Sequence, residues 1–279
     1  VAMPVAFAML GAVALALFTE GRPLAALLQR LYTPTQSFPM LAIPFFILAG
    51  SLMMSGKFGT YLINIARLLV GRFKGGLGQV SVMGAVMFAG VNGSAVADAT
   101  AMGNALIPVK LKSGYPRGFA AAINASSATI SVLLPPSIPL ILYGLVANVS
   151  VVNLFVAGIV PGLMLGVGMM CAIWFTAHRR NLPRAPLEGG FRAFRSQVWA
   201  AIPALLMPVF IVGMLRFGVA TPTEVSVMAV GYALVISAVV YRDLSLRSLW
   251  SAAVETSIMT GAVMIIIMAA STIQWLLTA

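Results

Sequence analysis

Two short polar stretches interrupt long apolar segments and contain residues that could hold a small cation. One reads Gly90-Val91-Asn92-Gly93-Ser94 and the other Pro135-Pro136-Ser137-Ile138-Pro139. Asn and Ser oxygens, with carbonyls released from helical hydrogen bonding, suit Na⁺, and glycine allows the tight turn. We therefore expect an ion site formed by Gly90, Asn92, Gly93, Ser94, Pro135 and Ser137. The alternative is that these glycines and prolines only kink helices for packing.

Three further polar residues lie near these stretches. Asp98 is the sole acidic residue deep in an apolar segment. Ionisable groups are costly in the membrane interior, so a functional role is the first hypothesis for such a residue. It could couple charge to a bound cation or cap its own segment. Asn124 and Ser127 share a helical face with small neighbours, which is typical of a cavity lining and equally of close helix packing.

Other chemistries have little support in the sequence. One Cys (Cys171) and one His (His178) exclude a disulfide framework and a metal cluster built from Cys or His. An intramembrane enzyme would need a nucleophile–base pair, and Asp98 has no such partner nearby. We expect no enzyme activity, no cofactor and no metal besides Na⁺. Nucleic acid is not an expected partner, because Lys and Arg form no stripe interleaved with aromatics.

The composition is that of a chain whose solvent is lipid. Of its 279 residues, 61% are hydrophobic and 8% are charged, and the mean hydropathy is +1.02. Soluble domains carry about 25% charged residues. The net charge of +11 fits a membrane protein, whose Lys and Arg gather in cytoplasmic loops. The sequence predicts an all-α polytopic membrane protein of the bacterial inner membrane, cut at both ends.

Segment lengths predict which helices must break. The apolar segments are 2–18, 39–55, 77–109, 118–149, 153–176, 198–214, 222–241 and 259–279. A helix over 77–109 would be about 50 Å long, too long for one crossing. Its Gly-rich middle predicts a hairpin, and the prolines within 118–149 predict a broken helix.

Charge predicts the direction of each crossing. All but three Lys and Arg fall into four clusters, near 57–74, 110–117, 179–195 and 242–247. If all four are cytoplasmic, 77–109 enters and leaves on the same side and is re-entrant, while the 19–38 loop is periplasmic despite Arg22 and Arg30. In residues 57–74, four basic residues interrupt an apolar periodicity, which predicts an amphipathic helix at the membrane interface, with its apolar face at Tyr61, Ile65, Leu68 and Leu69.

The chain also matches itself at an offset of 220 residues. Residues 5–15 (VAFAMLGAVAL) match 225–235 (VSVMAVGYALV), and 43–53 (IPFFILAGSLM) match 263–273 (VMIIIMAASTI). Because the charge pattern gives matched segments opposite directions, the repeat is inverted, a feature typical of secondary transporters. We expect scaffold helices and an interfacial arm at 1–76, half of a transport domain at 77–150, a helix and basic cytoplasmic loop at 151–197, and an incomplete second repeat at 198–279.

These motifs resemble the large membrane subunit of TRAP transporters, the DctM-like permeases. The resemblance covers nearly the whole chain and is carried by FPMLAIPFFILAGSLMMSG, GGLGQVSVMGAVMFAGVNGSAVADATAMGNALIPV, GYPRGFAAAINASSATISVLLPPSIPLILYG, LFVAGIVPGLMLG, TPTEVSVMAVGYALV and YRDL. It implies a small four-helix membrane subunit and a periplasmic binding protein as partners. It also implies Na⁺-coupled uptake of a carboxylate, such as a C4-dicarboxylate, and an elevator-type motion of the hairpin.

The chain departs from the family pattern at one point. Members usually carry Ser-Gly-Ser at the first hairpin tip, whereas this chain has Asn92-Gly93-Ser94. Asn also offers an oxygen, so the expectation of ion binding stands, although the ligand geometry it implies changes. Two alternatives stay open from the residues: an ion-coupled anion carrier of a related inverted-hairpin family that needs no binding protein, and a structural membrane scaffold.

Overall fold

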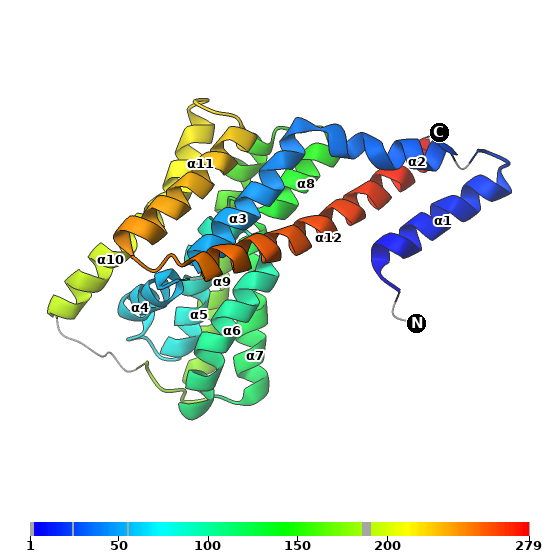
Figure 1. The fold of residues 1–279 in the computed structure, drawn as a ribbon. Coiled ribbons are helices and arrows are strands. Elements are labelled where there is room, and N and C mark those ends of the chain that lie inside the picture. The colour runs from blue at the N-terminus through cyan, green and yellow to red at the C-terminus, as the bar shows by residue number, and fades with distance from the viewer. Residues whose placement is uncertain (1–2, 24, 55, 186–190, 279) are drawn as a thin grey trace.

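Every regular element in the described part of the chain is a helix, as the sequence predicted. The computed structural model describes residues 3–23, 25–54, 56–185 and 191–278. In chain order the helices are α1 (Val5–Thr19), α2 (Ala25–Tyr32), η1 (Thr33–Gln36), η2 (Phe38–Leu41), α3 (Ala42–Met54), α4 (Phe58–Val70), α5 (Gly76–Asn92), α6 (Ala95–Lys112), α7 (Arg117–Ala128), η3 (Thr129–Val132), α8 (Ile138–Val146), α9 (Val151–Arg179), α10 (Phe191–Arg216), α11 (Pro222–Val235), η4 (Ile236–Val240) and α12 (Leu246–Thr278). Figure 1 shows their arrangement.

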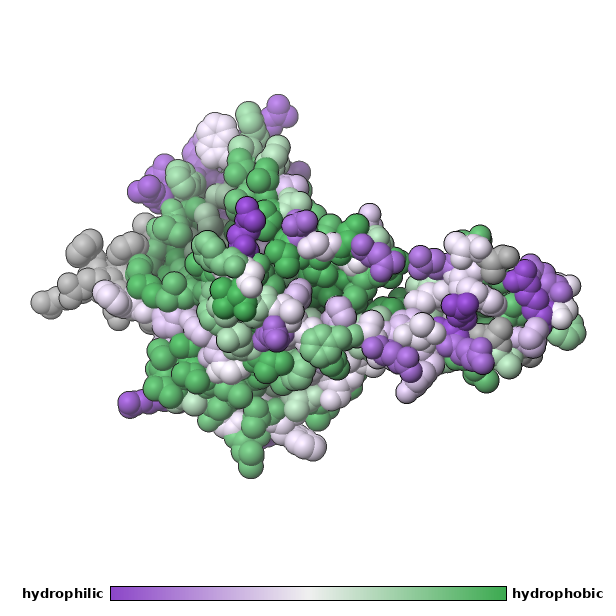
Figure 2. Space-filling model, turned by 90° about the horizontal axis from the view of Figure 1, so that it is seen from above, coloured by the Kyte–Doolittle hydropathy of each residue, from purple (hydrophilic) through white to green (hydrophobic). Residues whose placement is uncertain are grey.

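Within that part, three helices are long and apolar enough to cross a membrane. They span Val151–Arg179, Pro222–Val240 and Leu246–Thr278, and a bent pair, Leu27–Gln36 with Phe38–Met54, could form a fourth span. Large apolar side chains on α9 point outward, among them Val160, Met164 and Phe175. Figure 2 shows how much of one face is apolar. Because water would oppose exposing this much apolar surface, the protein is an integral membrane protein.

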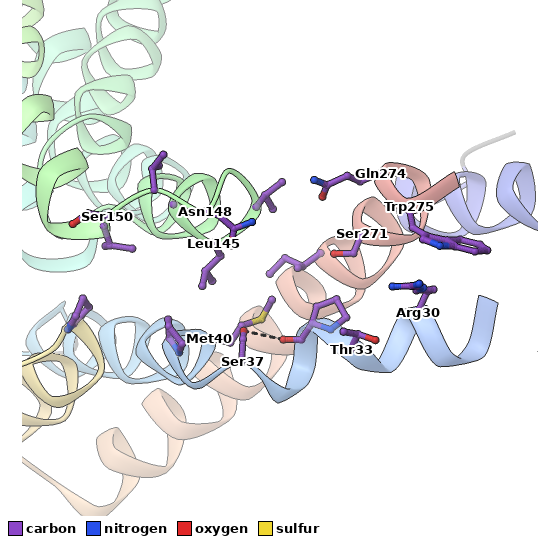
Figure 3. Close-up of a pocket in the computed structure, with 18 of the residues that line it drawn as sticks. Arg30, Thr33, Ser37, Met40, Leu145, Asn148, Ser150, Ser271, Gln274 and Trp275 are labelled. Atoms are coloured by element: carbon purple, nitrogen blue, oxygen red, sulfur yellow. Dashed lines mark hydrogen bonds between the residues drawn. The ribbon is translucent and has the colours of Figure 1, made fainter. Parts of the chain in front are cut away.

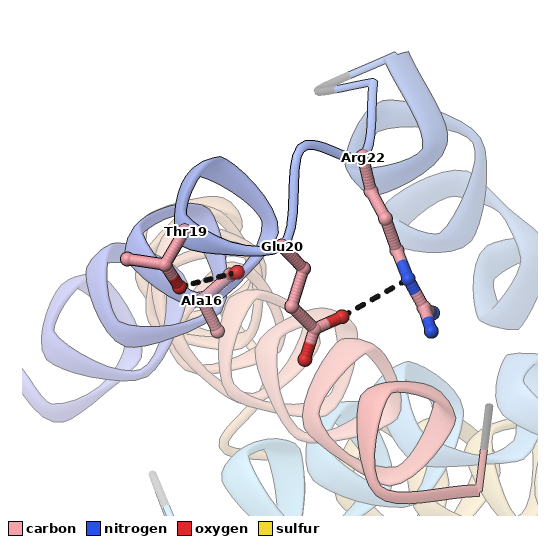
Figure 4. A network of polar contacts seen from close by, with 4 residues as sticks. All are labelled: Ala16, Thr19, Glu20 and Arg22. Carbon is pink, nitrogen blue, oxygen red and sulfur yellow. Dashed lines mark hydrogen bonds and ion pairs between the residues drawn. The ribbon is translucent and has the colours of Figure 1, made fainter.

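The 19–38 segment was predicted to be a loop, and this was wrong. It holds α2 and η1, and the pair that continues into α3 bends by 68°, next to Pro39. The two arginines of this segment are both engaged. Arg22 Nε lies 3.0 Å from Glu20 Oε2 (Figure 4), and the Arg30 guanidinium lies 5.2 Å from the centre of the Trp275 ring. These pairs show how a segment predicted to be periplasmic holds two cations.

Helix α4 is the predicted amphipathic helix, but its buried face differs from the prediction. Phe58, Leu62, Ile65, Ala66 and Val70 are buried, and the helix packs against α5 and α10. Of the residues expected on the apolar face, Ile65 is buried whereas Leu69 is 44% exposed. Relative to the predicted orientation, α4 is rotated about its axis so that Phe58 packs edge-to-face against Phe88 of α5, with ring centres 6.1 Å apart. An aromatic contact of this kind outweighs a smaller aliphatic contact on the neighbouring face.

Helix α12 is longer than predicted. The apolar pattern suggested a span over 259–279, but the helix begins at Leu246 and runs 33 residues without a break. Ser245 and Ser248 start it, since the Ser245 hydroxyl accepts from Ser248 N at 3.0 Å and the Ser248 hydroxyl accepts from Ser245 N at 3.0 Å. No proline interrupts its sequence, so length alone does not break it.

Two buried clusters join the elements around the hairpin. One spreads through α3, α4, α5, α8, α10, α11 and α12, with Phe46, Phe88 and Val225 among its members. The other joins the outer side of α5 to α7, η3 and α9 through residues such as Val82, Ile130 and Ile173. Helix α5 therefore has its two faces in different clusters, and its position fixes that of the polar stretch at its end.

Candidate functional site

The first polar stretch forms the turn of a helical hairpin, as predicted. Helix α5 ends at Asn92, Gly93 has φ +58°, and α6 begins at Ala95. The left-handed φ is strained for any residue with a side chain, so glycine suits this position. Ser94 then takes an extended conformation and accepts a hydrogen bond from Ala97 N at 3.4 Å, which caps α6. We call residues 92–94 the tip.

The second polar stretch breaks the helix that follows the hairpin. Helix α7 tightens into η3, which ends at Val132, and α8 starts only at Ile138. We call residues 133–137 the break. Ser137 caps α8 by accepting from Leu140 N at 3.4 Å, and its hydroxyl donates to the carbonyl of Val132 at 2.5 Å. One side chain therefore satisfies a group on each side of the break.

The tip and the break lie directly against each other. A Cβ added to Gly93 would lie 1.8 Å from the carbonyl oxygen of Pro136 and 2.9 Å from Cα of Ser137. The N-termini of α6 and α8 therefore meet next to the carbonyl end of α5. Helix N-termini favour an anion and C-termini favour a cation, so both signs of partial charge converge here.

A buried link joins the hairpin to the broken helix beside the tip. Asp98, on the first turn of α6, is fully buried, and its carboxylate accepts a hydrogen bond from the Ser131 hydroxyl of η3. At the next residue of α6, the Ala99 carbonyl accepts a hydrogen bond from the Asn124 side chain of α7 at 2.7 Å. A buried carboxylate is costly unless hydrogen-bonded, so this link ties the two elements together.

A small cavity of about 260 Å³ opens beside the tip. Its polar side chains are Ser94 and Thr100 of α6, Ser51 of α3 and Glu255 of α12. The first residue of α8, Ile138, completes the wall next to Ser94. The cavity thus lies between the hairpin and two helices, α3 and α12, that belong to different parts of the predicted repeat. We call it the tip cavity.

A larger cavity of about 860 Å³ lies where α2, η1 and the turn between α8 and α9 face the end of α12 (Figure 3). Arg30, Asn148, Ser271 and Gln274 line it, and Trp275 forms part of its wall beneath the guanidinium of Arg30. All these elements are at the ends that the charge pattern predicts to be periplasmic. We call it the outer cavity.

The structure distributes the predicted site residues among three environments. Gly93, Ser94 and Ser137 meet at the tip and the break. Gly90 and Pro135 both line an apolar cavity of about 550 Å³, and a Cβ on Gly90 would lie 2.3 Å from Pro208 of α10. Gly90 therefore has a packing role. Whether its carbonyl also faces an ion stays a prediction, and the side chain of Asn92 lies outside the described residues.

Asn124 and Ser127 lie in the contact between α6 and α7. Asn124 is 6% exposed and Ser127 is 1% exposed, and the Ser127 hydroxyl donates to the Asn124 carbonyl of its own helix at 3.1 Å. Gly103 of α6 leaves room for the Asn124 amide, since an added Cβ would lie 3.0 Å from its nitrogen. These contacts are those of close helix packing, one of the two roles that the sequence left open.

Sequence reasoning missed three residues of the tip cavity. Ser51 and Thr100 carried no signal of their own, because isolated hydroxyls are common in apolar helices. Ser51 did match Ser271 in the repeat, and that match could have pointed to it. Glu255 also lines the tip cavity, from α12. The described residues contain no group of three or more His, Cys, Asp or Glu that could hold a metal ion.

Comparison with known proteins identifies relatives over the full chain. The family described as "Tripartite ATP-independent periplasmic transporter, DctM component" matches residues 1–279. The chain is 45% identical to the uncharacterised protein y4mL of Sinorhizobium fredii over 278 residues, covering 99% of this chain and 66% of that protein.

Several relatives have names that state a substrate, among them two large permease proteins. The 2,3-diketo-L-gulonate TRAP transporter large permease protein YiaN of Escherichia coli is 38% identical over 283 residues, covering 100% of this chain and 65% of YiaN. The C4-dicarboxylate TRAP transporter large permease protein DctM of Vibrio cholerae is 37% identical over 246 residues, covering 88% of this chain and 54% of that protein. The chain thus spans between 54% and 66% of the length of these relatives.

Proposed function

Because the chain belongs to the DctM family of tripartite ATP-independent periplasmic transporters, we propose that it forms the substrate-translocating core of a Na⁺-coupled uptake system for a carboxylate. The curated relatives are permeases rather than enzymes. The observation that carries the proposal is the meeting of the tip and the break at Gly93 and Pro136. There, two unwound backbones meet in the interior of a membrane protein, where non-helical backbone is tolerated only if protein buries it or if it lines a water-filled cavity.

The polarity of the site supports binding of a cation together with an anion. Carbonyls at the ends of α5 and η3, with the hydroxyls of Ser94 and Ser137, would supply Na⁺ with oxygen ligands. The N-termini of α6 and α8 would attract a carboxylate in the tip cavity. A bound cation and a bound anion then stabilise each other, which is the electrostatic basis of coupling their movement.

An inverted repeat is supported by three contacts between helices. Under the offset of 220, α1 corresponds to the α11–η4 span and α3 to the second half of α12. A two-fold axis would then relate the packing of α3 on α11 to that of α12 on α1, and would make α3 and α12 pack on each other. All three pairs are in contact.

The two cavities follow the same relation. The tip cavity is lined by Ile47, Ser51, Met54 and Met259. The positions 220 residues away are Ile267, Ser271, Gln274 and Pro39, and these line the outer cavity. Matched positions therefore face cavities that we propose to lie toward opposite sides of the inner membrane, as an elevator-type carrier with two access routes requires.

The proposed partners and substrate follow from the family and from the printed names of relatives. We propose a small membrane subunit and a periplasmic binding protein as partners. The named substrates 2,3-diketo-L-gulonate and C4-dicarboxylate both carry carboxylates. Uptake that requires the neighbouring binding protein would support this assignment. Uptake of equal rate without any binding protein would instead indicate an independent anion carrier.

Removing the two serine hydroxyls at the tip and the break should weaken coupling to Na⁺. In the complete protein with its partners, the variant Ser94→Ala/Ser137→Ala is expected to need about tenfold more Na⁺ for half-maximal uptake, equivalent to losing about 1.4 kcal/mol of binding. The measurement is initial uptake into proteoliposomes over a Na⁺ series balanced with K⁺.

The control for that experiment is Ser245→Ala. Ser245 also caps a helix, accepting from Ser248 N at 3.0 Å at the start of α12, and it lines neither the tip cavity nor the outer cavity. Each lost cap costs about 1 kcal/mol of stability, so the control reports that loss alone. An unchanged Na⁺ requirement in the double variant would refute the assignment of these hydroxyls to the ion site.

The proposed re-entrant path of the hairpin predicts that both of its ends face the cytoplasm. Arg72 and Lys112 lie at the two ends and are exposed, whereas Lys110 is fully buried and unsuitable for labelling. Single cysteines at Arg72 and at Lys112, in a Cys171→Ser background, are expected to react with a membrane-impermeant maleimide only when the reagent can reach the cytoplasmic side of the membrane. Labelling of the two positions from opposite faces would exclude the re-entrant path.

A further inference from the structure

The loop between η4 and α12 reaches the N-terminus of α4. Asp243 Oδ2 accepts a hydrogen bond from the backbone N–H of Lys57 at 2.6 Å, and Lys57 is the residue that precedes the first turn of α4. The N–H groups of a first turn have no partner within the helix and lie at its positive end. Lys57 provides no side-chain cap of its own, so a carboxylate from a segment 186 residues away provides it.

The contact is closely fitted on both sides. A Cβ on Gly56 would lie 2.2 Å from Asp243 Oδ2, so only glycine leaves room for the carboxylate. Two residues before Asp243, the Tyr241 ring lies 5.4 Å from the ring of Tyr61 on α4, and Tyr241 is 6% exposed. The loop itself is held to η4, because Asp243 N donates to the carbonyl of Ser237 at 3.1 Å.

Along the rest of its length, α4 packs on α5 of the hairpin and on α10, so α10 would move together with α4. Phe58 packs edge-to-face on Phe88 of α5, and Gly59 leaves space for the same ring, since an added Cβ would lie 3.4 Å from it. At the other end of α4, the Gly71 carbonyl accepts from Ala185 N at 3.0 Å, next to the cluster that packs on the outer side of α5. A moving hairpin would therefore carry α4 with it.

Resting on the proposed function, we propose that Asp243 and Tyr241 form a latch that holds α4 and the hairpin against the second repeat, and that this latch opens whenever the hairpin moves. If the hairpin shifts relative to α11 and α12, either the buried face of α4 must leave α5 or the latch must separate. The α4–α5 face contains several buried apolar side chains, whereas the latch contains one hydrogen bond and one ring pair. The latch is the contact that yields, and Asp243 acts as a positioning residue.

A disulfide across the latch tests this directly. The added Cβ on Gly56 would lie 2.8 Å from Cγ of Asp243, so a sulfur near that Cγ position could bond to a cysteine at position 56. The test variant is Gly56→Cys/Asp243→Cys in a Cys171→Ser background, because Cys171 is exposed and could form unwanted disulfides. It is studied in the complete protein with its partners, with disulfide formation quantified by mass spectrometry.

Oxidation is expected to reduce uptake by the double variant at least tenfold, and dithiothreitol should restore it. The single variants Gly56→Cys and Asp243→Cys, oxidised in parallel, should lose nothing further. Full disulfide formation with unchanged uptake would overturn the latch while leaving the proposed function intact, whereas an unmodified protein that shows no Na⁺-driven uptake would overturn the proposed function itself. Should the double variant not fold, hydrogen–deuterium exchange of the Lys57 amide in the unmodified protein decides: exchange that rises when Na⁺ and substrate drive transport supports the latch, and exchange that stays constant counts against it.

Discussion

Alanine in place of Gly93 is expected to lower Na⁺-driven uptake by at least about a hundredfold. Two effects combine at this position. Gly93 has φ +58°, where a side chain costs about 1–2 kcal/mol, and its added Cβ would lie 1.8 Å from the Pro136 carbonyl oxygen. That oxygen belongs to the main chain and has no rotamer to escape into, so the tip and the break must move apart. A misplacement of about 1 Å in a functional site can cost a hundredfold in rate.

Gly114 provides the matched control for this substitution. It follows α6 with φ +84° and has no atom within 4 Å of an added Cβ. Gly114→Ala thus carries the backbone strain without the collision. Initial uptake rates, normalised to folded protein by size-exclusion chromatography, are compared for both variants. Equal losses in the two variants would mean that the separation of tip and break does not matter for transport.

Replacing Asp98 by asparagine is expected to lower uptake at least about tenfold and to change its dependence on Na⁺. The side chain keeps its shape and can still accept a hydrogen bond from Ser131, but the buried negative charge beside the tip is lost. If the carboxylate balances the charge of a bound cation, its removal weakens the binding of that cation. A tenfold loss of Na⁺ affinity corresponds to about 1.4 kcal/mol of binding free energy. The measurement is the Na⁺-to-substrate ratio and the apparent Na⁺ affinity.

Ser131→Ala separates this charge effect from a purely structural one. It removes the hydrogen bond but keeps the carboxylate, so it should cost about 1–3 kcal/mol of stability while the Na⁺-to-substrate ratio stays the same. Thermal unfolding and the ion ratio are measured on both variants. An unaltered ion ratio in Asp98→Asn would dismiss a coupling role and leave Asp98 as a structural link.

Local signals in the sequence predicted the interruptions of the helices well. The glycines around Asn92 and the prolines around Ser137 act through their own backbones, so the helix breaks they cause can be predicted without knowledge of the rest of the chain. The segment 77–109 was too long for one crossing, and it is a hairpin. In contrast, α12 is also very long but unbroken, which shows that length suggests a break only where residues that favour one are present.

Contacts between distant segments were beyond sequence reasoning. The sequence led us to expect that the two polar stretches share one site, but it does not indicate that Gly90 packs on Pro208 or that Asp243 caps α4, because these contacts depend on how whole helices pack. The prediction of the buried face of α4 was wrong for the same reason, since contact with Phe88 of α5 determines which side of α4 faces inward. The start of α12 at Leu246 was likewise not apparent from the apolar pattern.

The contact between Gly93 and Pro136 has a consequence for how such a protein can vary. It is made by main-chain atoms, which every amino acid shares, so most substitutions around it leave its chemistry intact. The walls of the tip cavity, in contrast, are side chains: Ser51, Thr100 and Glu255. Under the proposed function, mutation could therefore reshape the space offered to a solute while the neighbouring backbone junction stays as it is, and a new cargo would not require a new ion site.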